Sequence, residues 1–251
     1  MSKIAEWVVI VGATGAFGSV MVERLLGKGL GVVAVARSAD SLAALAAKHP
    51  GVVPCIADIA NDASIATIRA ALPGPVRMVV HGPGVSVGGG VLNIDIAAMV
   101  DAVNIKVGGL LRLVRAVDSR LSVNSRLVAI GGHYGFEPTA YAAAAGIANS
   151  ALVNVVRQLS LAYGERGITA HMVAPGPADT ERLRRVAADR ARLQGTTVDA
   201  VMDAMKAESS LGVFTEPAQV AWALEILLAP EASAMTGSSL MLDAGRRRGL
   251  P

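Results

Sequence analysis

The feature that most constrains the fold of this chain is the alternation of short, unbroken apolar runs with longer segments rich in Ala and Leu. Unbroken hydrophobicity over four or five residues is typical of strands buried on both faces, as in a parallel sheet between helices. The apolar runs are Trp7–Val11, Val32–Ala36, Val52–Ile56, Met78–Val80, Leu127–Ile130, Thr169–Val173 and Ser239–Leu242. The segments between them predict helices at Phe17–Lys28, Ala39–Lys48, Ala63–Leu72, Ile96–Asp118, Tyr141–Tyr163 and Pro217–Leu228. The pattern therefore predicts a doubly wound parallel α/β sheet of about seven strands, with helices on both faces.

One stretch, Asp179–Ser210, departs from this alternation, with two charged helical pieces around Gly195. No linker-like or repetitive segment marks a boundary, so we expect residues 1–251 to form a single domain with a lid at about 179–210. The apolar side chains of the lid either wall a hydrophobic pocket or pack the lid onto the body, and the sequence leaves both open. They are Leu183, Val186, Leu193, Val198, Val201, Met202 and Met205.

Composition argues against several classes of protein. A net charge of +3 over 251 residues, with three Phe, three Tyr and two Trp, gives little basis for nucleic-acid binding. The mean hydropathy of +0.50 raises the question of a membrane span, but the longest uncharged run, between Glu137 and Arg157, is too rich in small and polar residues. The single Cys55 excludes a disulfide scaffold, and four scattered His residues predict no metal site. We therefore expect a cytoplasmic protein that binds neither nucleic acid nor membrane.

A glycine-rich segment follows the first predicted strand and precedes a helix: Gly12-Ala13-Thr14-Gly15-Ala16-Phe17-Gly18. Glycines at such a turn let the backbone approach a pyrophosphate, whose charge the helix N-terminus favours. We therefore predict dinucleotide binding at Gly12, Thr14, Gly15, Phe17 and Gly18.

The ends of the second and third predicted strands indicate which dinucleotide binds. Arg37 and Ser38 follow the second strand, and no carboxylate occurs there before Asp40. A carboxylate at this place would bind the ribose 2′-hydroxyl of NAD, whereas Arg37 could pair with a 2′-phosphate, so NADP(H) is favoured over NAD. A solvated surface arginine is the alternative. Asp58 and Ile59 follow the third strand and are expected beside the adenine, although a lone Asp there is also a common helix cap.

Taken in order, these motifs resemble the short-chain dehydrogenase/reductase family, in its single-domain branch, over nearly the whole chain. Three further segments match the family's pattern: His81-Gly82-Pro83-Gly84, Pro175-Gly176-Pro177-Ala178-Asp179-Thr180, and an ending with Thr236-Gly237 and Asp243-Ala244-Gly245. The resemblance implies a Rossmann fold, with His81 and Gly82 beside the cofactor and Pro175, Gly176 and Thr180 against the nicotinamide. It also implies a homodimer or homotetramer formed through the helices Ile96–Asp118 and Tyr141–Tyr163.

The same resemblance implies that Tyr141 transfers a proton to or from the substrate and that Asn104 belongs to the catalytic set. The family's Lys, expected four residues after the Tyr, is replaced by Ala145, and the expected Ser falls at Gly132. Loss of the ammonium hurts alcohol oxidation more than carbonyl reduction, because a neutral phenol is already the acid that reduction needs. His133, after the fifth strand, is a candidate replacement acid or base, and a packed structural His is the alternative.

The sequence therefore favours an NADP(H)-dependent oxidoreductase that reduces a small carbonyl compound, with Tyr141 as the proton donor. Two alternatives stay open. One is a catalytically impaired NADP-binding relative, either a pseudoenzyme or a chain whose Lys was replaced by engineering. The other is a lyase or isomerase that uses the same pocket without redox chemistry.

Overall fold

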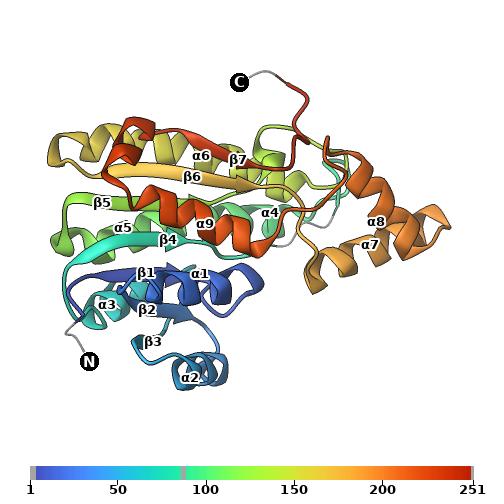
Figure 1. Cartoon of the computed structure of the whole chain (residues 1–251). Coiled ribbons are helices and arrows are strands. Elements are labelled where there is room, and N and C mark those ends of the chain that lie inside the picture. Colours follow the sequence, from blue (N-terminus) through green and yellow to red (C-terminus); the bar gives the residue numbers. More distant parts are fainter. Residues whose placement is uncertain (1–3, 86–88, 250–251) are drawn as a thin grey trace.

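A computed structural model describes residues 4–85 and 89–249, and its centre is one seven-stranded parallel sheet (Figure 1). The strand order is β3-β2-β1-β4-β5-β6-β7, so the chain winds outward from β1 in one direction and then from β4 in the other. The strands are β1 (Trp7–Val11), β2 (Gly31–Ala36), β3 (Val52–Ile56), β4 (Val76–His81), β5 (Leu121–Ile130), β6 (Thr169–Pro175) and β7 (Ser239–Leu242). This arrangement confirms the predicted doubly wound fold.

The unbroken apolar strands are explained by two cores, one on each face of the sheet. Along β1, Val8 and Ile10 point into one core, and Val9 and Val11 point into the other. The first core is closed by α1 (Ala16–Leu26), α2 (Ala39–Lys48) and α9 (Pro217–Leu227). The second is closed by α3 (Ala63–Ala70), α5 (Gly109–Val117) and α6 (Ala143–Tyr163).

The predicted long helix Ile96–Asp118 is not a regular helix, which corrects the sequence-based expectation. It consists of α4 (Ile96–Val103), a π turn at Asn104–Gly108, and α5. His81, fully buried at the end of β4, has its Nε2 3.0 Å from the carbonyl oxygen of Ile105. A Cβ atom on Gly109 would lie 2.8 Å from Cε1 of the same imidazole. The imidazole therefore packs closely against the helix at the π turn. Single π turns within α-helices are frequent at functional sites.

Several other boundaries also differ from the prediction, two of them at α6 and β5. Helix α6 begins at Ala143, so Tyr141 lies in the turn before the helix. Strand β5 begins at Leu121, six residues earlier than predicted, with Asn124 in a left-handed conformation (φ 69°). The register of the β4–β5 pair shifts in this region, between Val76 and Met78, which lets the earlier residues join the sheet.

Helices α7 (Glu181–Gln194) and α8 (Val198–Ala207), orange in Figure 1, project beyond the carboxyl ends of the strands. They share a small core of their own, formed by Ala187, Ala191, Val201, Met202 and Met205. Leu183 and Val186 line a cavity, whereas Leu193 is 80% exposed. The apolar residues of the predicted lid therefore divide between helix–helix packing, a cavity wall and solvent.

Short 3₁₀ turns complete the chain at Asp118–Arg120, His133–Gly135, Gly164–Arg166 and Pro230–Met235. In the part of the chain that the structure describes, none of the helices combines the length and the apolar character that a membrane span requires. Over those same residues, no group of three or more His, Cys, Asp or Glu side chains is placed to hold a metal ion.

Candidate functional site

The first of two cavities at the carboxyl ends of the strands gathers most of the residues predicted to hold the adenine end of a dinucleotide. It lies where β1, β2, β3 and β4 end, the usual ligand position in this class of sheet. Its lining includes Gly12, Thr14, Gly15, Arg37, Ser38, Asp58, Ile59 and Gly82. The tertiary structure thus brings together residues from four separate segments.

The glycine-rich turn has two different steric requirements. Gly12 has a positive φ of 84°, and a Cβ there would lie 2.8 Å from the carbonyl oxygen of Gly82. Gly18 is buried in the first turn of α1, where a Cβ would lie 2.1 Å from the carbonyl oxygen of Gly12. Gly18 therefore lets the helix pack against the turn, whereas Gly15, the exposed N-cap, lines the cavity.

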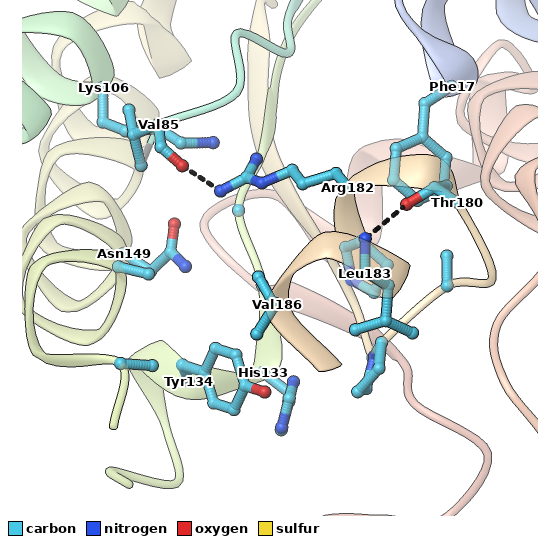
Figure 2. A pocket seen from close by; sticks show the side chains of 18 of the residues that line it. Phe17, Val85, Lys106, His133, Tyr134, Asn149, Thr180, Arg182, Leu183 and Val186 are labelled. Carbon is cyan, nitrogen blue, oxygen red and sulfur yellow. Dashed lines mark hydrogen bonds between the residues drawn. The ribbon is translucent and has the colours of Figure 1, made fainter. Parts of the chain in front are cut away.

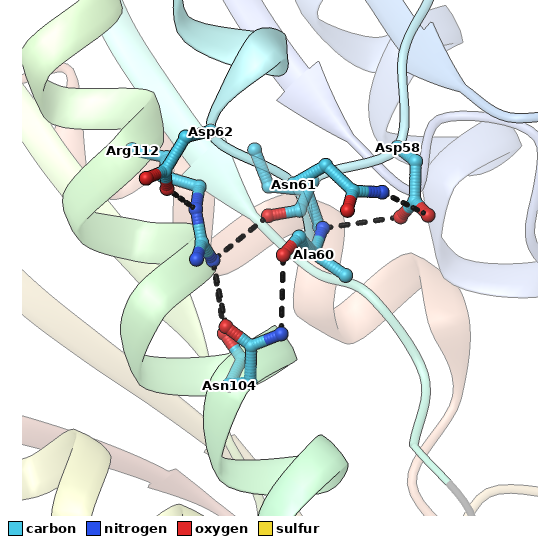
Figure 3. A network of polar contacts seen from close by, with 7 residues as sticks. Asp58, Ala60, Asn61, Asp62, Asn104 and Arg112 are labelled. Atoms are coloured by element: carbon cyan, nitrogen blue, oxygen red, sulfur yellow. Dashed lines mark hydrogen bonds and ion pairs between the residues drawn. The ribbon is translucent and has the colours of Figure 1, made fainter.

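Asp58 shapes the loop after β3 (Figure 3). Its Oδ1 accepts a hydrogen bond from the backbone N–H of Ala60 at 3.1 Å, and its Oδ2 accepts one from Nδ2 of Asn61 at 2.8 Å. The carboxylate thus caps its own loop while it lines the first cavity. The capping role of Asp58 is therefore compatible with its predicted contact with the cofactor.

Asn104 belongs to the same network (Figure 3). Its Nδ2 donates to the carbonyl oxygen of Ala60 at 3.1 Å, and its Oδ1 accepts from Arg112 at 2.9 Å. Arg112 also donates to Asp62 at 2.6 Å. The Asn104 side chain thus supports the loop after β3 and does not line the second cavity. Its predicted catalytic role stays a prediction.

The second cavity combines the predicted catalytic residues Tyr141 and His133 with the segment predicted to face the nicotinamide. Figure 2 shows His133 and Tyr134 on one side of this cavity, with Thr180 on α7's side of it. Phe17, Pro175, Gly176 and Thr180 line it, as do Gly132 and Ala145, the two positions where the resemblance leads us to expect Ser and Lys. His81 is fully buried and lines neither cavity, so its predicted contact with the cofactor receives no support from the geometry.

Tyr141 has two notable neighbours. Its hydroxyl oxygen lies 3.0 Å from that of Tyr134, and the guanidinium carbon of Arg190, on α7, lies 4.3 Å from the centre of its ring. Burial, with the neighbouring Tyr141 as a second cause, raises the pKa of Tyr134 well above its usual value. Tyr134 therefore keeps its proton and can donate a hydrogen bond to the Tyr141 oxygen.

His133 is buried between the second cavity and a smaller one that Arg246 lines. Burial lowers the pKa of His133 to about 4, and the positive charge of Arg246 adds to the decrease. The imidazole is therefore neutral at pH 7, so it does not supply the positive charge that the family's Lys would have at position 145. Its acid–base role stays a prediction.

Two buried polar residues of the second cavity, Lys106 and Asn149, were not predicted from the sequence. Lys106, in the π turn, is 6% exposed, and its Nζ donates to the carbonyl oxygen of Ile130 at 2.8 Å. Asn149, on α6, is 5% exposed. The sequence signal for Lys106 is that it is the only charged residue between positions 102 and 111, two residues after Asn104.

Comparison with known proteins agrees with this geometry. Residues 12–247 match the family model described as enoyl-(acyl carrier protein) reductase. The chain belongs to the short-chain dehydrogenase/reductase family. Members of this family are oxidoreductases that bind a nicotinamide cofactor, and the fold and the two adjoining cavities of this short-chain dehydrogenase/reductase agree with that class.

Individual relatives span nearly the full chain. A cis-4-hydroxycyclohexanecarboxylate dehydrogenase of Sinomonas cyclohexanicum is 30% identical over 254 residues, covering 94% of each protein. A 3-oxoacyl-(acyl-carrier-protein) reductase of Salmonella typhimurium is 24% identical, covering 98% of each. Among solved structures, a single-residue variant of the actinorhodin polyketide ketoreductase with NADPH has a TM-score of 0.89 at 23% identity, with 96% of this chain and 97% of that one covered.

Proposed function

We propose that this short-chain dehydrogenase/reductase is an NADP(H)-dependent reductase of small carbonyl compounds and that Tyr141 donates the proton. The observation that carries the proposal is the position of the Tyr141 hydroxyl. It is held beside Tyr134 in the cavity that Pro175, Gly176 and Thr180 also line. A phenol placed there can reach a carbonyl oxygen beside the predicted nicotinamide site.

The first cavity fits the adenosine half of NADP(H). At Gly12 a Cβ would lie 2.8 Å from the carbonyl oxygen of Gly82, so the turn needs glycine there, and Arg37 and Ser38 line the wall after β2. Neither Asp nor Glu from the end of β2 lines this cavity, while the Arg37 guanidinium is suited to a 2′-phosphate. A solved relative was crystallised with NADPH. Gly12, Thr14, Gly15, Arg37 and Asp58 would hold this half of the cofactor.

The reaction needs one proton from the protein. The nicotinamide, when bound, supplies the hydride to the carbonyl carbon. Tyr141 gives its proton to the carbonyl oxygen, which yields an alcohol. Tyr134, still protonated, then donates a hydrogen bond to the Tyr141 oxygen and stabilises its charged form. Because the resting phenol is the acid required, reduction is expected to be faster than oxidation at neutral pH.

The mouth of the site supports a substrate that carries negative charge. Tyr141 lies at the edge of a groove lined by Arg182, Arg185 and Arg190 and by one acid, Asp189. An excess of guanidinium groups attracts carboxylates and similar anions. One relative is named for a hydroxycyclohexane carboxylate. We therefore propose a small keto acid or a similar anionic carbonyl compound as the substrate class.

The proposal is tested by titrating the protein with NADPH and NADH, followed by a panel of cyclic and linear ketones with and without a carboxylate. We expect NADPH to bind more tightly than NADH. Arg37→Ala should weaken NADPH binding by about 10- to 100-fold and leave NADH binding unchanged, since a hydrogen bond to a charged group contributes roughly 1.5–3 kcal/mol. Absence of NADPH binding would refute the proposed cofactor.

A second candidate function is a non-catalytic relative that binds NADP(H), and the replacements at Ala145 and Gly132 favour it. Tight NADPH binding without oxidation of NADPH by any ketone of the panel would support this candidate over the reductase.

We also propose a homodimer or homotetramer that uses α4 and α6. Ile96 and Val100 on α4 are 64% and 57% exposed, and Ile147 on the adjoining α6 is 42% exposed. Exposed apolar groups on neighbouring helices support a subunit interface. Sedimentation should show an oligomer, and Val100→Asp should shift it towards the monomer.

A further inference from the structure

We propose that Lys106 and Asn149 take the places of the active-site lysine and serine that positions 145 and 132 do not supply. This inference rests on the proposed reductase function and names two further residues of the same site. Neither residue stands at the position where the family pattern has its lysine or serine. Both reach the second cavity from other parts of the fold.

Lys106 brings a cation into the cavity from the wall opposite the lid helix. It lies in the π turn, and its ammonium donates to the carbonyl oxygen of Ile130 at the end of β5. Figure 2 shows Lys106 across the cavity from Thr180 and Leu183. The preceding carbonyl, that of Ile105, is bound by His81 at the end of β4. These two contacts fix the turn on the strand ends and direct the side chain into the same cavity that Ala145 lines.

The ammonium of Lys106 has no carboxylate partner among the described residues that line the cavity. Neither Asp nor Glu is among the described residues lining this cavity, while a second cation, Arg182, is. An almost fully buried ammonium without a carboxylate is costly unless it serves a ligand or a reaction. One hydrogen bond to Ile130 leaves two N–H donors for cofactor hydroxyls or the substrate oxygen.

Asn149 brings a neutral donor to the position of the missing serine. It lies one helical turn after Ala145, and a Cβ added to Gly132 would be 3.1 Å from its Nδ2. The amide therefore lies directly beside the place where the side chain of a serine at position 132 would begin. Its Oδ1 is buried and has no partner in the described part of the chain. An amide so placed can donate a hydrogen bond to a substrate oxygen, as a serine hydroxyl would.

The charge of Lys106 depends on pH near neutrality. Burial lowers its pKa to about 7, and the positive charge of Arg182 on α7 adds to the decrease. The other titratable groups around it are His81 on β4 and the cavity residues His133, Tyr134 and Tyr141. Both histidines have pKa values of about 4 or lower, so they do not titrate near pH 7. Lys106 is therefore charged at pH 6 and mostly neutral at pH 8.

The first test compares Lys106→Met and Asn149→Ala with two surface variants, Lys48→Met and Asn154→Ala. NADPH affinity is measured by fluorescence, and steady-state reduction is measured from pH 6 to pH 8. Lys106→Met should weaken NADPH binding about 10-fold and lower kcat/KM about 100-fold at pH 6. It should also abolish the decline in both quantities between pH 6 and pH 8. Asn149→Ala should lower kcat about 10- to 100-fold with NADPH affinity unchanged, and the surface variants should match the parent.

The second test moves each group to the family's position. Lys106→Met/Ala145→Lys and Asn149→Ala/Gly132→Ser should each recover most of the lost activity, which a merely structural role would not allow. Arg190→Met tests the other cation near Tyr141. If it removes the pH dependence while Lys106→Met keeps it, Lys106 is not the active cation and the inference is overturned.

Three further outcomes separate this inference from the proposed function. If the parent reduces ketones and both Lys106→Met and Asn149→Ala do so equally well, the inference fails while the reductase stands. If these variants lose activity but keep the parent's NADPH affinity and pH profile, and the moved groups restore nothing, the residues are structural and the inference fails. If the parent neither binds NADPH nor reduces any ketone, the proposed function fails and the inference fails with it.

Discussion

The glycine-rich turn offers a sharp prediction because two of its glycines serve different purposes. Gly18→Ala places a methyl group 2.1 Å from the carbonyl oxygen of Gly12 and 2.6 Å from the backbone of Ala13. Both contacts are to backbone atoms, which cannot rotate away as the end of a side chain can. Helix α1 must therefore move off the turn, or the turn must distort.

The magnitude follows from two opposing effects. Alanine in a helix is favoured over glycine by about 1 kcal/mol. Overpacking costs about 1–3 kcal/mol and occasionally more, and a contact this short belongs at or above the upper end. We expect a net loss of about 2 kcal/mol in the free energy of unfolding. At about 2–4 °C per kcal/mol for a chain of this size, Tm should fall by roughly 4–8 °C.

Gly15→Ala is the matched control on the same turn. Its Cβ would lie 3.4 Å from the nearest atom, the carbonyl oxygen of Gly12, which is ordinary contact. Its φ of −80° suits alanine, so the loss of stability should be no more than the N-cap preference for glycine over alanine, roughly 0.5–1 kcal/mol. Since Gly15 lines the first cavity, its methyl group should instead weaken NADPH binding.

Thermal unfolding and fluorescence titration with NADPH, carried out on both variants, separate the two effects. A Tm for Gly18→Ala equal to that of the parent would show that the turn and helix have room to relax. If Gly18→Ala and Gly15→Ala destabilised the protein equally, the proposal that Gly18 serves packing and Gly15 serves cofactor binding would be wrong.

Three further predictions concern the scaffold. Arg126 is fully buried and donates to the carbonyl oxygens of Leu227 and Ala229 at the end of α9. Arg126→Met should therefore lower the free energy of unfolding, measured in urea, by about 3 kcal/mol. Burial lowers the pKa of His171 to about 4, so above pH 6.5 the ring is neutral in both the folded and the unfolded state. As pH falls from 6.5 to 4, the imidazole binds a proton in the unfolded state but not in the folded state, which should lower the free energy of unfolding by about 3 kcal/mol. In urea unfolding at a series of pH values, His171→Gln should remove this loss. Arg112 donates to Asp62 and to the carbonyl oxygen of Ile59, and so holds the loop after β3. Arg112→Met should free this loop and raise the Kd for NADPH about 10-fold with kcat unchanged. An unaltered Kd would show that NADPH binding does not depend on these contacts of Arg112.

Much of the fold and the first cavity is determined by local sequence. Strands buried on both faces must be apolar throughout, so the runs around Val9, Val33 and Val79 predict a parallel sheet without knowledge of their partners. The carboxyl ends of such strands meet at one edge, so the turn at Gly12 and the residue Arg37 could be assigned to one cavity before the structure was known.

The second cavity was only partly predictable, because its polar groups come from elements whose relative placement no local pattern specifies. Tyr141 was predicted by resemblance, but the 3.0 Å contact of its hydroxyl with Tyr134 and the stacking of Arg190 depend on a 3₁₀ turn and on helix α7. The absence of Lys at position 145 and of Ser at position 132 was visible in the sequence alone.

Only the tertiary structure decided which polar side chains line the cavity at positions 145 and 132, where Lys and Ser are absent. In a regular helix the direction of Lys106 would follow from its place in the sequence. The π turn beside His81 changes that direction and fixes the ammonium on Ile130, far from it in the chain. Asn149 approaches Gly132 because α6 packs against the end of β5. The sequence by itself determined the sheet and predicted the nucleotide-binding turn and the lack of Lys and Ser at positions 145 and 132, whereas long-range packing determined which polar groups line the cavity with Tyr141.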